Sequence, residues 1–372
     1  MSEQRESGID ALRAALTILV VFHHAAITYG GGGGWYYREV AQGGARGTWV
    51  LDFFCAINQS YFMGLFFLIA GYFTPRAVER HGACGYLRER LSRLGLPLLF
   101  YLLLLSPVTI ALAAIAKGRP FLKSLVYAYI HGLMEPGPLW FAEALLIFAA
   151  LYVAAKLLAP GRFEFVGPAT FPSNGTLLLA AIGVGAVAFA LRLVWPIGVQ
   201  PLGLQLGFFA SYVVLFSAGC KAAWLPSLDG ASERQRLLWR RIAWVTLPVL
   251  PAIVILGNHD PAFGGTTDGG WNARAIVYAF WEPFLAWGTI LTLLHGFTLR
   301  FITLGPLWAQ LSRRAYAVYI IHPPVLVGIA LAWRGVDAPP LIKFPITGTA
   351  ACLACFLLAG LLLRSPTLRR VL

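Results

Sequence analysis

The chain has 372 residues, of which 58% are hydrophobic and only 12% are charged, and its mean hydropathy is +0.71. Soluble domains carry about 25% charged residues, so this composition excludes an ordinary soluble protein. The apolar residues fall in blocks of about twenty with basic residues between them, which predicts an all-α polytopic membrane protein embedded in a lipid bilayer.

The formal net charge of +13 is concentrated in connections between the apolar blocks. If the N-terminus is cytoplasmic, the two most basic connections also lie in the cytoplasm, as the positive-inside rule requires. We therefore expect cytoplasmic N- and C-termini, and the charge gives no reason to invoke a nucleic acid. The basic residues of these connections are Arg76, Arg80, Arg88, Arg90 and Arg93, and then Lys221, Arg234, Arg236, Arg240 and Arg241.

A bundle of about ten transmembrane helices accounts for the apolar blocks, since one crossing takes about 20 residues. The segment 118–135 is shorter and more mixed, which favours an interfacial or re-entrant position, with an eleventh span as the competing interpretation. We expect one transmembrane domain over residues 1–372, with no appended soluble domain. The predicted spans are 9–29, 53–74, 94–116, 138–159, 175–197, 203–225, 237–257, 273–295, 310–333 and 341–363.

The first apolar block carries ionisable residues at both ends. A signal peptide is the competing interpretation, but two histidines follow a very short apolar core, so we expect a retained first helix. His24 follows Arg13 by 11 residues, which is about 20° past three helical turns with a rise of about 16 Å, so both share a face. Asp10 and Thr17 join this stripe, whereas His23 points about 100° away.

A charged or titratable residue at membrane depth is costly unless it faces protein or water, and by default it suggests a function. For this helix, the competing interpretation is that Asp10 and Arg13 pair at one interface and that the histidines mark the other. Haem ligation by a histidine is a weaker alternative, because it needs a second histidine at matched depth.

The ninth predicted span carries Tyr316, Tyr319 and His322 at steps of three, which places them on one helix face. Pro323 and Pro324 follow, and we expect them to interrupt this helix where its backbone lines a cavity or packs in protein. The competing interpretation of His322 is a buried, hydrogen-bonded histidine without a direct role in chemistry.

Three further features lie in or next to predicted spans. Glu143 can pair with an arginine, bind an acceptor or assist His24. For Glu282, which precedes Pro283 in the eighth predicted span, a buried and hydrogen-bonded group without a direct role in chemistry is the competing interpretation, as for His322. Cys352 and Cys355 form a CxxC inside an apolar helix, where packing is the expected role and a redox or zinc site is the competing one.

Five blocks, spread over nearly the whole chain, resemble the membrane-bound acyltransferase 3 family and occur in its order. The family includes O-acyltransferases of glycans, among them glucan-modifying succinyltransferases. The blocks are GIDALRAALTILVVFHH at 8–24, FFLIAGYFTPR at 66–76, RERLSRLGLP at 88–97, PLWFAEALLIF at 138–148 and SRRAYAVYIIHPPVL at 312–326.

The resemblance implies a fold of about ten helices and transfer of an acetyl or succinyl group from cytoplasmic acyl-coenzyme A to a hydroxyl. The implied acceptor is a cell-envelope glycan or glycolipid, and the implied location is the bacterial inner membrane. Acyl-coenzyme A is the expected co-substrate, and no metal is expected.

The family's first-helix arginine and histidine correspond here to Arg13 and His24, and its RxxR pair to Arg90 and Arg93. This makes His24 the candidate general base, with Arg13 as a further candidate catalytic residue and Asp10 as a candidate carboxylate that orients or charge-balances the site. The three arginines are candidates for binding the coenzyme A phosphates, and simple topology signals are the competing interpretation of Arg90 and Arg93. The candidate acceptor-binding residues are Trp140, Glu143, Tyr319 and His322.

Two departures leave the acceptor open. Gly137 and Pro138 precede Trp140 where one branch of the family tends to have a histidine, and Ala70 stands where serine is frequent. Aromatic residues at 35–37 and the loop 258–271 suit carbohydrate, but also suit a membrane interface, so no acceptor-binding role is assigned to them.

The alternative class is a proton-coupled or solute transporter that performs no covalent chemistry, and an inactive scaffold is a third possibility. The combination of Arg13, His24 and the RxxR pair favours the enzyme, because a carrier has no evident reason to keep these residues together.

Overall fold

The computed structural model describes residues 2–159, 161, 170–225 and 227–371. The chain divides into two compact units. Unit 1 comprises Met1–Leu12, Ile57–Tyr86 and Leu151–Thr303, and unit 2 comprises Arg13–Ala56, Leu87–Ala150 and Leu304–Leu372. Helices α1 (Ser2–Thr28) and α6 (Trp140–Leu158) each begin in one unit and end in the other, whereas α2 (Trp49–Arg90) begins and ends in unit 2 and contributes its middle part to unit 1.

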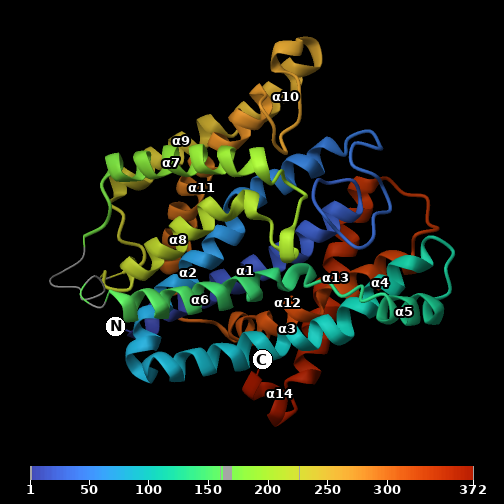
Figure 1. Cartoon of the computed structure of the whole chain (residues 1–372), viewed down its shortest axis with the longest axis horizontal. Helices are drawn as coiled ribbons and strands as arrows, with labels where there is room; N and C mark the ends of the chain where they lie inside the picture. The colour runs from blue at the N-terminus through green and yellow to red at the C-terminus, as the bar shows by residue number, and fades with distance from the viewer. Residues whose placement is uncertain (1, 160, 162–169, 226, 372) are drawn as a thin grey trace. The chain divides into compact units, whose positions relative to one another are not determined.

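Unit 2 contains residues 13–24 of the first of the five sequence blocks and the whole of the last block, 312–326. In it, α12 (Pro306–Ala332) packs along α13 (Pro340–Leu362) and against α4 (Ser106–Ile115), and α5 (Phe121–Ile130) lies beside α4 (Figure 1). Unit 2 also contains the π-helical turns η1 (Leu91–Gly95) and η2 (Tyr101–Leu105), the 3-10 turn η3 (Gly137–Leu139), and the helices α3 (Leu96–Phe100) and α14 (Pro366–Val371).

In unit 1, α11 packs against α7 and α9, and α8 packs against α7 (Figure 1). The helices are α7 (Asn174–Val194), α8 (Phe209–Ala222), α9 (Glu233–Thr246), α10 (Val249–His259) and α11 (Ala273–Arg300). The 3-10 turns are η5 (Pro201–Gly203), η6 (Leu206–Phe208) and η7 (Pro261–Phe263).

Eight helical runs among the described residues are long and apolar enough to cross a membrane. The run Trp49–Ile115 has 67 residues, or about 100 Å if straight, and therefore covers the second and third predicted spans. Gly82, with a φ of 70°, bends it. The sixth predicted span corresponds to the shorter helix Leu206–Ala222, and the other seven each match one run.

The segment 118–135 is not an eleventh span. Its helix, α5, has only 10 residues, which is about 15 Å against a hydrocarbon core of about 30 Å.

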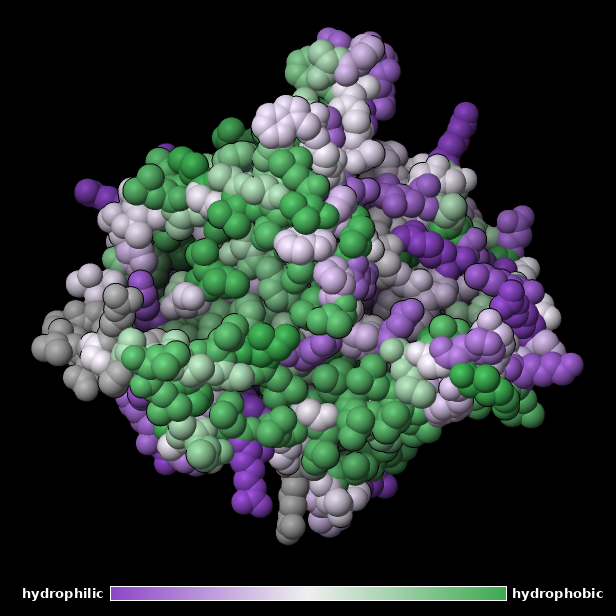
Figure 2. Space-filling view, in the orientation of Figure 1, coloured by the Kyte–Doolittle hydropathy of each residue, from purple (hydrophilic) through white to green (hydrophobic). Residues whose placement is uncertain are grey.

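Apolar side chains cover the outward faces of several helices, as expected where lipid replaces water. Figure 2 shows such surfaces over α7 and over the run from α3 into η2. They include Leu178, Leu179, Ile182 and Val187 on α7, and Leu96, Leu99, Phe100, Leu103 and Leu104 on the second run. The chain is thus an all-α polytopic membrane protein.

The core of unit 2 joins the second half of α1 to α12 and α13. Small residues let these helices approach closely, as is usual in membranes. Cys352 and Cys355 are free and buried in this core, so they serve as packing residues there. The cluster comprises Val21, Ala25, Ala317, Val318, Leu326, Ala351, Cys352, Cys355, Phe356 and Ala359.

The expected interruption of the ninth predicted span is wrong, because α12 runs without a break through Pro323 and Pro324. Each proline lacks the N–H that would bond to the carbonyl four residues earlier. Neighbouring helices and side chains tolerate such losses in membrane proteins. In α12, Pro323 leaves the carbonyl of Tyr319 without its usual backbone N–H donor.

Candidate active site

Two histidines from opposite ends of the chain meet in unit 2. Nδ1 of His24 on α1 lies 3.1 Å from Nε2 of His322 on α12, and the ring centroids are 5.1 Å apart. His322 is completely buried, whereas His24 is partly exposed. His24 is therefore the accessible member of the pair.

The hydrogen bonds assign the protons on both rings. Nδ1 of His322 lies 2.7 Å from the carbonyl oxygen of Tyr319, and a carbonyl only accepts, so this nitrogen carries the proton. Nε2 of a neutral His322 is then an acceptor, and His24 donates to it from Nδ1. Nε2 of a neutral His24 consequently keeps its lone pair.

Pro323 explains why the carbonyl of Tyr319 is available. In an unbroken helix, this oxygen would accept the N–H of the residue four positions later, but proline has none. His322 takes the vacant place. The sequence His-Pro thus fixes the tautomer of His322, and His322 fixes that of His24.

Trp35 completes a group of three rings. Its indole stacks on His24 with centroids 4.1 Å apart and planes at 18°, and it lies 5.9 Å from His322. Trp35 belongs to the loop that follows α1. Sequence reasoning noticed the aromatic residues at 35–37 but assigned them no role, because helical periodicity does not place a loop residue.

A face of α12 leads from this group toward Arg93. Tyr319 donates to the carbonyl of Pro138, and Tyr316 donates to the carbonyl of Arg93 at 2.7 Å. The rings of the two tyrosines stack with centroids 6.4 Å apart. Since six residues of helix rise about 9 Å, this face spans about that distance between Tyr316 and His322.

The three candidate arginines lie on helices of unit 2 and differ in environment. Arg13 is exposed on α1, and Arg90 is partly buried at the end of α2. Arg93 is exposed in a π-helical turn, and Glu89 pairs with it at 3.3 Å. The π turn changes the helical register after Arg90, so the simple i, i+3 face expected from sequence does not apply to this pair.

The other candidates are not among the described contacts of the two histidines. Trp140 contacts Phe141, whose ring lies 6.4 Å from that of Tyr319. Glu143 is partly exposed on α6 and is not among the contacts described for His24 or His322. Asp10 belongs to unit 1, whereas Arg13 and His24 belong to unit 2.

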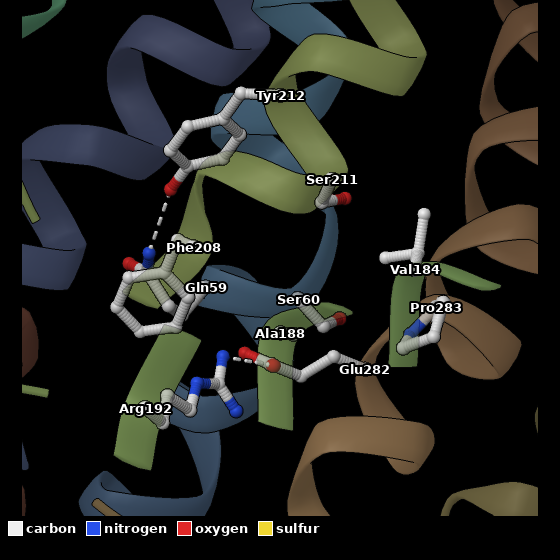
Figure 3. A pocket seen from close by; sticks show the side chains of 10 residues that line it. All are labelled: Gln59, Ser60, Val184, Ala188, Arg192, Phe208, Ser211, Tyr212, Glu282 and Pro283. Atoms are coloured by element: carbon white, nitrogen blue, oxygen red, sulfur yellow. Dashed lines mark hydrogen bonds and ion pairs between the residues drawn. The ribbon is translucent and has the colours of Figure 1, made fainter. Parts of the chain in front are cut away.

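A separate buried ion pair, shown in Figure 3, lies in unit 1. Arg192 on α7 pairs with Glu282 on α11, with side chains 1% and 8% exposed. The guanidinium also donates to the carbonyl of Gly207 at 3.1 Å and lies over the rings of Phe208 and Tyr278. Sequence reasoning singled out Glu282 but not Arg192, because nothing in the pattern joins the two helices.

A small cavity lined by both polar and apolar side chains adjoins this pair (Figure 3). It has room for about one water molecule. Gln59 donates to the hydroxyl of Tyr212 at 3.0 Å beside it, and Ser60 and Ser211 complete the polar lining.

We expect the Glu282→Leu variant to lower the free energy of unfolding by about 3–5 kcal/mol, because it leaves Arg192 buried without its counter-charge. The double variant Arg192→Met/Glu282→Leu should regain most of this loss, since it removes both charges. Denaturant unfolding in detergent measures both, with Val187→Ala on the exposed face of α7 as control. Equal stability of the single variant and the parent would contradict the prediction.

No group of three or more His, Cys, Asp or Glu side chains that could hold a metal ion occurs in the described part of the chain. The fold and the site define an all-α membrane protein with a hydrogen-bonded histidine pair inside its helix bundle.

The family model described as an acyltransferase domain matches residues 6–364. The chain therefore belongs to the membrane-bound acyltransferase 3 family, and it is a membrane acyltransferase. Comparisons with curated proteins and with solved structures gave no match.

Proposed function

We propose that the protein is an O-acyltransferase that moves an acetyl- or succinyl-type group from acyl-coenzyme A to a hydroxyl of a cell-envelope glycan or glycolipid. His24 is its general base. The observation that carries this proposal is the hydrogen bond from Nδ1 of His24 to Nε2 of His322, which leaves Nε2 of His24 as a proton acceptor. Family membership supports the acyl-transfer part.

The reaction needs a base because a sugar hydroxyl is a poor nucleophile near neutral pH. Nε2 of His24 takes the hydroxyl proton as the oxygen attacks the thioester carbonyl, and a C–O bond forms. The C–S bond then breaks, and the coenzyme A sulfur leaves with the proton that His24 returns. His322 does not touch the reactants in this scheme and acts as a positioning residue for His24.

The donor is proposed to enter from the side of the three arginines. Guanidinium groups suit the phosphates of coenzyme A through paired hydrogen bonds. The rise of about 16 Å from Arg13 to His24 is comparable with an extended pantetheine arm of about ten backbone bonds of roughly 1.5 Å. The α12 face that carries Tyr316 and Tyr319 extends from Arg93 toward His322, which supports a path for such an arm along this face.

The proposed orientation places both termini and the arginines in the cytoplasm of a bacterial cell, with the protein in the inner membrane. Acyl-coenzyme A is made in the cytoplasm, so this orientation gives the donor access. The positive-inside distribution of Lys and Arg supports it.

We expect the double variant Arg90→Gln/Arg93→Gln to raise the KM for acyl-coenzyme A about 10- to 100-fold with little change in kcat, because charge-assisted bonds contribute about 1.5–3 kcal/mol. Steady-state kinetics in proteoliposomes measures this effect. Arg80→Gln, in the same basic connection, is the matched control. An unchanged KM together with altered membrane orientation would show that the two arginines are topology signals.

The function itself is tested with purified protein in proteoliposomes, acyl-labelled coenzyme A and a cell-envelope glycan extract. The proposal predicts equal amounts of free thiol and of labelled, base-labile ester on the glycan. Uptake of a solute without thioester consumption would support the transporter instead.

A further inference from the structure

Trp35 lies in the loop after α1, and neighbouring residues of this loop make several contacts that hold the loop in place. Arg38 donates to the carbonyls of Ile27 at 3.4 Å and Gly31 at 2.9 Å. Glu39 pairs with Lys343 on α13, whose side chain is only 3% exposed. The position of the indole is therefore fixed by the surrounding structure.

The glycine run gives this loop its path. Gly33 has a φ of 128°, and a Cβ there would lie 2.8 Å from the side chain of Ile27. At Gly31, a Cβ would lie 2.8 Å from Sγ of Cys55. Glycine at both positions lets the chain turn tightly over the end of α1 and return Trp35 to the ring of His24.

The titratable groups that face His24 are His322 on α12 and His23 on its own helix, and both are histidines. Among the described contacts of His24, none is with a carboxylate. The indole of Trp35 is the contacting group with an electron-rich face, and such faces attract a cation within about 6 Å of the ring centroid.

We propose that Trp35 is a positioning residue that stabilises His24 through its stacked indole face when His24 becomes positively charged during acyl transfer. This inference rests on the proposed function, because His24 gains the charge only when it takes the hydroxyl proton. The neutral ring gains much less from the indole than the charged ring does. Trp35 therefore favours the transition state over the ground state and acts on kcat rather than on KM.

The test compares Trp35→Phe and Trp35→Leu with the parent protein in a pH series of kcat. Since a cation over an aromatic face contributes about 0.5–2 kcal/mol, Trp35→Leu should lower kcat about 2- to 30-fold. The pH at which the rate reaches half its plateau should also fall, because the charged ring has lost a stabilising neighbour. Trp35→Phe, which keeps an aromatic face, should give an intermediate result for both quantities.

Trp333→Phe is the matched control. Trp333 lies under Lys343, at the same end of unit 2 as the loop contact with Glu39, and its described contacts do not include His24. The Trp333→Phe variant should have the same half-plateau pH as the parent protein. Thermal unfolding of each variant in detergent identifies any variant that is misfolded. If Trp35→Leu does not fold, the comparison of Trp35→Phe with the parent protein still tests the inference.

The outcomes separate this inference from the proposed function. If turnover of the parent protein depends on His24 but the Trp35→Leu variant has an unchanged half-plateau pH, only the role of Trp35 is overturned. If the parent protein shows no turnover that depends on His24, both the role of Trp35 and the proposed function are overturned. An ordered shift in the series Trp, Phe, Leu supports the inference.

Discussion

Replacement of His24 by glutamine is expected to lower kcat for acyl transfer by about 10²- to 10⁴-fold, which is the usual contribution of a general base. Glutamine retains a polar side chain of similar length, but its amide does not take up a proton near neutral pH. The KM for acyl-coenzyme A should change little, because the donor phosphates are proposed to bind at the arginines. Initial rates of thiol release in proteoliposomes measure both constants.

His23→Gln is the matched control for this variant. His23 is the adjacent residue on the same helix and is buried, but its ring meets His24 edge-on and does not share the hydrogen bond to His322. We expect a much smaller loss of kcat from this change. Equal losses in the two variants would show that the segment tolerates no polar substitution and would remove His24 from the proposed role.

Replacement of His322 by leucine should lower kcat on the order of 10²-fold, because His24 then loses the acceptor that keeps its proton on Nδ1. A base in the wrong tautomer has its lone pair on the wrong side of the ring, and such errors are known to cost as much as about 10⁴-fold in hydrolases. The bond between Nε2 of His322 and Nδ1 of His24 is 3.1 Å long, so it is short enough to set this preference.

His322→Gln distinguishes positioning from packing. Its amide oxygen can accept the proton that His24 donates, so it should recover much of the activity lost in His322→Leu, although both replacements remove the imidazole. Loss of activity to the same extent in both variants, with normal thermal unfolding, would contradict the tautomer argument. It would leave His322 as a residue needed only for its shape.

The membrane class and most of the spans could be predicted because lipid imposes a simple requirement on sequence. Every crossing needs about 20 apolar residues with internally satisfied backbone groups, and this length is visible in the hydropathy. Helical phase also placed Tyr316, Tyr319 and His322 on one face before any contact was known. These are properties of single helices, which local sequence determines.

Contacts between helices were not predictable in the same way. The meeting of His24 with His322 depends on how α1 packs against α12, and periodicity within either helix contains no information on that packing. The same is true of Arg192, whose partner Glu282 lies on another helix. Trp35 was missed because its position depends on a turn made by Gly31 and Gly33.

The prolines of α12 illustrate a local rule that tertiary structure overrides. The sequence predicts that Pro323 and Pro324 interrupt the helix, because each proline removes one backbone hydrogen bond. The helix instead continues, and the side chain of His322 uses the carbonyl that Pro323 leaves without a donor. A loss that weakens an isolated helix here provides the bond that orients a ring at the candidate active site.

The position of the proton on the His24 ring decides whether this residue can act as the general base, and it can be measured without substrate. Protein labelled with ¹⁵N at its seven histidines and placed in lipid nanodiscs gives one pair of ring-nitrogen resonances for each, and His24→Gln identifies the pair of interest. At a pH where the ring is neutral, we expect a protonated Nδ1 and an unprotonated Nε2 for His24, and loss of this preference in His322→Leu. A proton on Nε2 of His24 in the parent protein would contradict this expectation.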